Sequence, residues 1–99
     1  MCNTYNFVYI LATKRDGVFY TGVTSDLPKR LEQHRQGYFG GFTRKYGIHK
    51  LVWLEEHTDI REAIVREKAI KHWRRAWKIA LIETANPEWK DLWDEISGL

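Results

Sequence analysis

A glutamate stands where a helix would be expected to bury an apolar side chain. With about 100° between successive residues, Glu67 lies about 20° from Ile60, in the middle of the apolar face of a predicted helix. A carboxylate is rarely buried unless it is paired or binds a metal ion. Glu67 is therefore a candidate metal ligand, or the partner of Arg30 or of a nearby lysine in an ion pair.

Two polar residues occupy a comparable place in an earlier predicted helix. His34 lies within the apolar stripe that begins at Leu27, and Arg30 borders that stripe. A guanidinium is planar and permanently charged, so it matches the geometry of phosphate oxygens. The simpler interpretations are a hydrogen-bonded histidine at the rim of the core and an arginine whose stem covers apolar surface.

Positive charge is concentrated in parts of the chain, although the formal net charge is only +3. Residues 1–50 carry eight Lys or Arg against three Asp or Glu, and a second basic cluster lies at 66–78. Such clusters are typical of proteins that bind a polyanion such as nucleic acid. The candidate phosphate contacts are Arg44, Lys45, Lys71, Arg74, Arg75 and Lys78. The alternative is a solvated basic face, with Trp53, Trp73 and Trp77 mainly in the core.

The elements that must position these residues follow from hydrophobic periodicity and turn signals. The chain of 99 residues is 43% hydrophobic and 29% charged, which favours one folded domain spanning residues 1–99. The predicted order is β-β-α-β-α-α, with strands at 5–11, 18–24 and 51–55 and helices at 26–37, 59–84 and 88–96. The long helix is expected to bend near Trp73 and to stop at Asn86, which precedes a proline. This order predicts an α+β fold with a small, mainly antiparallel three-stranded sheet flanked by helices.

The composition also bears on where the chain works. No apolar run approaches the roughly 20 residues of a membrane span, so no membrane association is expected. Cys2 is the single cysteine, and the first residues lack the pattern of a secretory signal. We therefore expect a cytoplasmic protein.

The first two strands carry motifs that resemble the GIY-YIG nuclease superfamily. Its two namesake tripeptides lie on adjacent strands, and here Val8-Tyr9-Ile10 and Tyr20-Thr21-Gly22 have ten residues between their tyrosines. The family's helix arginine corresponds to Arg30, its metal-binding glutamate to Glu67 and a late asparagine to Asn86. Further segments, among them Gly41-Phe-Thr-Arg-Lys-Tyr46 and Asn86-Pro-Glu-Trp89, resemble the short, stand-alone bacterial branch of this superfamily.

The motifs depart from the family pattern at several positions. Phe7 replaces the leading glycine of the first tripeptide, and Thr21 stands in the middle of the second. Val23 and His34 occupy positions that hold lysine and tyrosine in the DNA-repair branch, whereas histidine at the second position resembles the phage-type homing enzymes. Proton transfer is the part of the mechanism that these departures leave open.

The resemblance implies a metal-dependent endonuclease that hydrolyses phosphodiester bonds, with DNA as the expected substrate. Glu67 would bind a single Mg²⁺ or Mn²⁺, Arg30 would contact the phosphate, and Tyr9 or Tyr20 would polarise or deprotonate water, with His34 as proton partner. Gly22 would let a phosphate approach or mark a strand bulge, and Asn86 would contact nucleic acid or only end a helix. Two other functions stay open: a nucleic-acid-binding module without turnover, and a protein-interaction adaptor.

Overall fold

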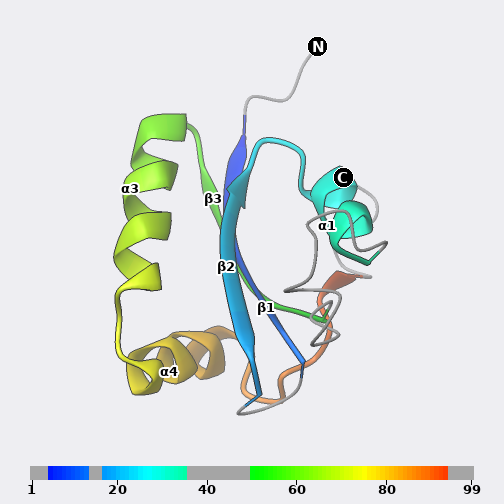
Figure 1. The fold of residues 1–99 in the computed structure, drawn as a ribbon, viewed down its shortest axis with the longest axis vertical. Coiled ribbons are helices and arrows are strands. Elements are labelled where there is room, and N and C mark those ends of the chain that lie inside the picture. The colour runs from blue at the N-terminus through cyan, green and yellow to red at the C-terminus, as the bar shows by residue number, and fades with distance from the viewer. Residues whose placement is uncertain (1–4, 14–16, 36–49, 94–99) are drawn as a thin grey trace.

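In the part of the chain that the structure describes, the central sheet has three strands and is antiparallel throughout. The computed structural model describes residues 5–13, 17–35 and 50–93. The strand order is β2-β1-β3. The elements are β1 (Asn6–Ala12), β2 (Phe19–Thr24), α1 (Leu27–Arg35), β3 (Lys50–His57), α3 (Ile60–Lys71) and α4 (Arg75–Ala85). The predicted α+β class and antiparallel sheet are confirmed (Figure 1). The order β-β-α-β-α-α also holds for the described elements, but its last two helices have other bounds than predicted.

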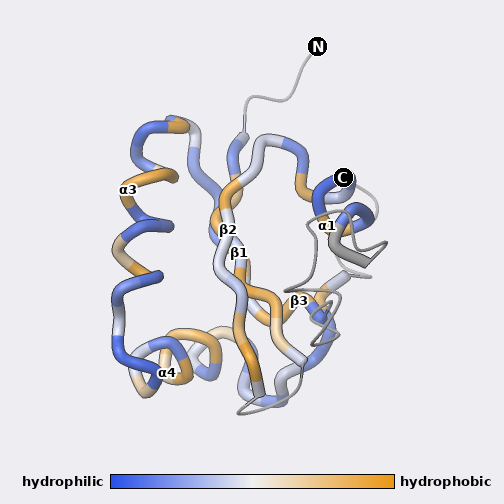
Figure 2. Tube along the Cα trace, viewed as in Figure 1, coloured by the Kyte–Doolittle hydropathy of each residue, from blue (hydrophilic) through white to orange (hydrophobic). Residues whose placement is uncertain are grey.

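The central strand β1 is buried along its whole length because helices cover both faces of the sheet. Figure 1 shows α1 on one side of the strands and α3 on the other. Alternate side chains of a strand point to opposite faces, so Val8 and Ile10 join the core under α3, whereas Tyr9 and Leu11 join the core under α1. Figure 2 shows hydrophilic stretches on α1 and α3, the two helices that flank the strands, and hydrophobic stretches along the strands between them.

The predicted helix at 59–84 is two helices rather than one bent helix. Asp59 caps the first, because its side chain accepts a hydrogen bond from the backbone N–H of Arg61 at 2.9 Å. The backbone N–H of Trp73 then bonds to the carbonyl of Ile70, and Arg74 is extended, so the regular helical pattern stops. The break turns α4 across one end of α3 (Figure 1) and lets Ile82 join the same core as α3.

The predicted helix at 88–96 is absent from the described part of that range up to Leu92. Trp89 has a φ of 56°, which no right-handed helix accommodates. Its indole is instead buried, stacks on Phe19 and donates a 2.8 Å hydrogen bond to Glu83. As predicted, Trp89, Leu92 and Trp93 pack onto the body of the molecule.

The helices of the described segments are too short or too polar to cross a lipid bilayer.

Candidate active site

The ring of Tyr9 passes across the neighbouring strand at Gly22. The two residues are partners in the β1–β2 register, and Tyr9 is fully buried. A Cβ atom on Gly22 would lie only 2.5 Å from Cζ of Tyr9. The glycine is therefore required by this contact. The β1–β2 register runs without interruption through Gly22, so it is not a bulge. The phosphate approach that the family resemblance implied at Gly22 stays a prediction.

This crossing brings the Tyr9 hydroxyl over β2, an outer strand of the sheet. Tyr20 lies on the same face, with ring centroids 6.4 Å apart and planes inclined by 32°. Tyr20 is only partly buried, and its ring packs against the core under α1. The two phenols of the family motif are thus neighbours, one deep and one nearer the surface.

Arg30 from α1 forms a hydrogen bond with the side chain of Tyr9. Burial raises the pKa of the Tyr9 hydroxyl well above its ordinary value, and nearby Tyr20 and the charge of Glu67 raise this pKa further. Arg30 opposes the shift, because its positive charge and its hydrogen bond both favour the phenolate. At neutral pH the Tyr9 hydroxyl keeps its proton.

Glu67 is buried on α3, as its place on the apolar face predicted. Its Oε2 atom pairs with Nζ of Lys71 at 2.5 Å, one helical turn away. The lysine pairing that the sequence left open is therefore present. The residues that the structure describes give Oε1 no hydrogen bond or ion pair.

Half of the buried Glu67 carboxylate is therefore available to a hard cation. Mg²⁺ and Mn²⁺ prefer oxygen ligands, and Mg²⁺ keeps several waters, so one protein carboxylate is enough to hold it beside a phosphate. Within residues 5–13, 17–35 and 50–93, no group of three His, Cys, Asp or Glu side chains forms a metal cage. The buried Glu67 carboxylate fits the role of a single oxygen ligand to a cation that keeps most of its waters.

The side chains of three predicted site residues lie outside the part of the chain that the structure describes. Position 34 falls within α1, but the side chain of His34 lies outside the described residues. Arg44 and Lys45 also lie outside them.

The basic residues of the α3–α4 region do not form one uniform surface. Arg75 and Lys78 point into a hollow beside the β1–β2 hairpin. Arg74 instead lies over the ring of Trp77, which is 55% exposed. The prediction that Trp77 belongs mainly to the core is wrong, because α4 turns away from α3 and leaves this side chain on the outside.

Asn86 is buried and fully engaged with the protein. Its Nδ2 donates to the carbonyls of Val52 at 3.0 Å and Lys90 at 2.8 Å, and its Oδ1 accepts from the backbone N–H of Lys90 at 3.0 Å. These bonds tie the segment after α4 to β3. The sequence alternatives for Asn86 were a nucleic-acid contact and a helix terminator, and the observed bonds favour a structural role.

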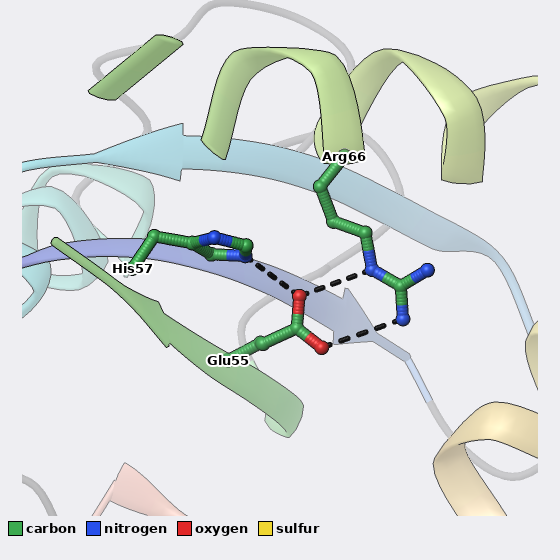
Figure 3. Close-up of polar contacts among 3 residues, drawn as sticks. All are labelled: Glu55, His57 and Arg66. Atoms are coloured by element: carbon green, nitrogen blue, oxygen red, sulfur yellow. Dashed lines mark hydrogen bonds and ion pairs between the residues drawn. The ribbon is translucent and has the colours of Figure 1, made fainter. Parts of the chain in front are cut away.

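A second polar cluster, not anticipated from the sequence, joins β3 to α3 (Figure 3). Glu55 accepts hydrogen bonds from Nε and a terminal nitrogen of Arg66, at 3.0 and 3.3 Å, and its Oε1 lies 2.7 Å from Nε2 of His57. The guanidinium of Arg66 also lies over the rings of Trp53 and Trp73. This cluster covers the outer side of the core between β3 and α3. Because Arg66 is engaged with Glu55 and the two tryptophans, we do not count it among the cations that would bind a ligand. No local sequence signal pairs residues eleven positions apart on different elements.

Comparison with known proteins gives a consistent result. The profile of the GIY-YIG catalytic domain matches residues 5–80. A UPF0213 protein of Clostridium perfringens is 43% identical over 79 residues, which are 80% of this chain and 84% of that protein. A UPF0213 protein of Syntrophus aciditrophicus is 40% identical over 84% of this chain and 94% of its own length. The solution NMR structure of a UPF0213 protein from Bacillus halodurans aligns with a TM-score of 0.56 at 31% identity, over 88% of this chain and 92% of that one.

Proposed function

Because the chain belongs to the GIY-YIG family, we propose that it is an endonuclease that hydrolyses phosphodiester bonds in DNA with the help of one Mg²⁺ or Mn²⁺. The observation that carries this proposal is the environment of the Tyr9 hydroxyl. It forms a hydrogen bond with Arg30 of α1 and lies within the electrostatic influence of Glu67 on α3. Arg30 and Glu67, from helices on opposite faces of the sheet, thus both influence the pKa of the Tyr9 hydroxyl, which lies above β2.

Arg30 and Glu67 have complementary tasks in this proposal. The Arg30 guanidinium binds the non-bridging oxygens of the phosphate, where charge accumulates as water attacks. Glu67 contributes a buried carboxylate oxygen as a ligand for the cation. When bound there, a divalent cation supplies charge neutralisation at the phosphate and at the departing oxygen.

The two tyrosines position the attacking water. Tyr9 keeps its proton at neutral pH because burial raises its pKa, so it acts as an orienting hydroxyl rather than as a preformed base. Arg30 lowers the free energy needed to ionise the Tyr9 hydroxyl transiently, because its positive charge favours the phenolate. Tyr20, beside it and partly exposed, is the phenol that solvent reaches more easily. His34 remains the proposed proton partner.

The test is cleavage of plasmid and branched DNA by purified protein with Mg²⁺ or Mn²⁺. We expect nicking that is lost in Glu67→Ala and in Arg30→Ala. Glu62→Ala is a matched control, because Glu62 is an exposed acid in the first turn of the same helix. Cleavage that survives unchanged in Glu67→Ala would contradict the proposal and indicate a contaminating nuclease.

A specific contact supports a second function, that of a nucleic-acid-binding module without turnover. The pairing of Glu67 with Lys71 satisfies part of the acid without any cation. This alternative predicts DNA binding that weakens steeply with salt, as counterion release requires, and no cleavage with any divalent metal.

A further inference from the structure

A hollow of about 410 Å³ opens where the end of the β1–β2 hairpin meets the junction of α3 and α4. It combines backbone and aromatic surface from the hairpin with two cations from α4. Its described lining contains no acidic side chain, and consists of Gly17, Val18, Phe19, Trp73, Arg75 and Lys78.

The position of Arg75 in this hollow is held by two contacts. Its guanidinium lies over the ring of Phe19, with Cζ 4.2 Å from the ring centroid. One terminal nitrogen donates to the carbonyl of Gly17. Among the residues that the structure describes, no other contact engages the remaining donors of the planar guanidinium. A guanidinium held in place loses less entropy when it binds phosphate.

Lys78 lies three residues farther along α4, on the same side of the helix. It is partly buried, and its Nζ donates to the carbonyl of Lys71 at 3.3 Å. Burial lowers its pKa, and the charge of Arg75 lowers it further. Two cations are thus held together against their mutual repulsion, and an anion between them would relieve that repulsion.

The hollow is connected to the candidate active site through Lys71. The backbone carbonyl of Lys71 accepts from Lys78, and its side chain pairs with Glu67. Lys71 is four residues beyond Glu67 on α3, a separation of about 6 Å along the helix axis. The hollow therefore lies near the proposed cutting position, but is distinct from it.

We propose that Arg75 and Lys78 form a subsite for a backbone phosphate of the DNA strand, a few nucleotides from the phosphate that is cut. This inference rests on the proposed function, because it places a nucleic-acid strand across α3 and the start of α4. The subsite fixes the register of the strand relative to Glu67 and reads no sequence.

The test uses a series of oligonucleotides, each with one neutral methylphosphonate at a different position, and measures binding at several salt concentrations. In the wild-type protein, one position should weaken binding by about tenfold. In Lys78→Gln that position should no longer differ from its neighbours, and the slope of log affinity against log salt should fall by about one. Arg75→Gln should behave in the same way, whereas Arg74→Gln, the matched loss of a neighbouring charge outside the hollow, should keep the position-specific effect.

Binding distinguishes this inference from the proposed nuclease activity. If no DNA is cut but the position-specific effect disappears in Lys78→Gln, the nuclease proposal fails and the subsite stands. If Lys78→Gln keeps the wild-type positional profile and salt slope, the subsite is wrong whether or not DNA is cut. Inorganic phosphate that perturbs the NMR signals of Lys78 and Arg75 as strongly as DNA, with no positional effect in the oligonucleotides, would also overturn it. If loss of the Gly17 contact unfolds Arg75→Gln, Lys78→Gln carries the test alone.

Discussion

The Nζ atom of Lys71 lies 2.5 Å from Oε2 of Glu67, so the acid on which the proposed chemistry depends is already paired on its own helix. The lysine side chain is 49% exposed, whereas the glutamate side chain is 10% exposed. A cation that binds Glu67 must compete with this ammonium group. A long side chain with an exposed end can turn to solvent or to a phosphate at little cost.

Removing Lys71 should therefore strengthen metal binding. In Lys71→Met we expect the affinity of the protein for Mn²⁺ to rise several-fold, because the carboxylate loses its competing cation. Isothermal titration with Mn²⁺ in the absence of DNA measures this directly. Lys68→Met is the control, since Lys68 is an exposed lysine of the same helix with no described contact to Glu67. Equal Mn²⁺ affinity in Lys71→Met and wild type would show that the pair does not control the site.

A methyl group at position 22 should displace Tyr9 from the site. In Gly22→Ala the new carbon would collide with the phenol ring, and overpacking of this kind typically costs about 1–3 kcal/mol of unfolding free energy. Cleavage should fall on the order of 10²-fold, because small misplacements of catalytic groups have effects of that size. Urea unfolding and plasmid nicking are the measurements.

A double variant identifies the cause of that loss. If the collision with Tyr9 is responsible, Gly22→Ala should cost much less stability when Tyr9 is already leucine. An equal cost in both backgrounds would place the strain in the backbone of β2 instead.

Tyr9 should make the folded protein sensitive to alkaline pH. Its pKa is raised by burial in the folded state, whereas an unfolded tyrosine ionises near pH 10. Above about pH 10 the unfolded chain binds fewer protons than the folded protein, so stability falls as pH rises, by up to about 1.4 kcal/mol per pH unit. Urea unfolding between pH 8 and 11 should show a shallower decline in Tyr9→Phe than in wild type. Identical declines would mean that Tyr9 ionises equally in both states.

Asn86 should matter for stability rather than for DNA contact. Asn86→Ala removes three hydrogen bonds and leaves the buried carbonyl of Val52 without its donor, which we expect to cost about 2–4 kcal/mol. Thermal unfolding measures the loss, and Glu88→Ala, at an exposed neighbouring position, serves as control. A folded Asn86→Ala protein of unchanged stability that no longer binds DNA would restore the nucleic-acid role that the family resemblance implied.

Much of this architecture follows from periodicity along the chain. Runs of β-branched and aromatic residues predicted the strands. The helical repeat placed Glu67 on a buried face, where the structure has it. A turn signal predicted the hairpin and hydrophobic periodicity the following helix, while the spacing of Tyr9, Tyr20 and Arg30 carried the family resemblance. These features are local, because each depends on residues that are close together in the sequence.

The tertiary structure decided which partner each of these residues has. The separation of α3 from α4 depends on how Ile70 and Ile82 share one core, and the left-handed backbone of Trp89 depends on its packing against Phe19. The bonds of Asn86 reach back 34 residues to β3. Such contacts join segments that are distant in sequence, and their free energy overrides the local preference of the chain for helix or strand. A helical or strand pattern in the sequence therefore does not predict them.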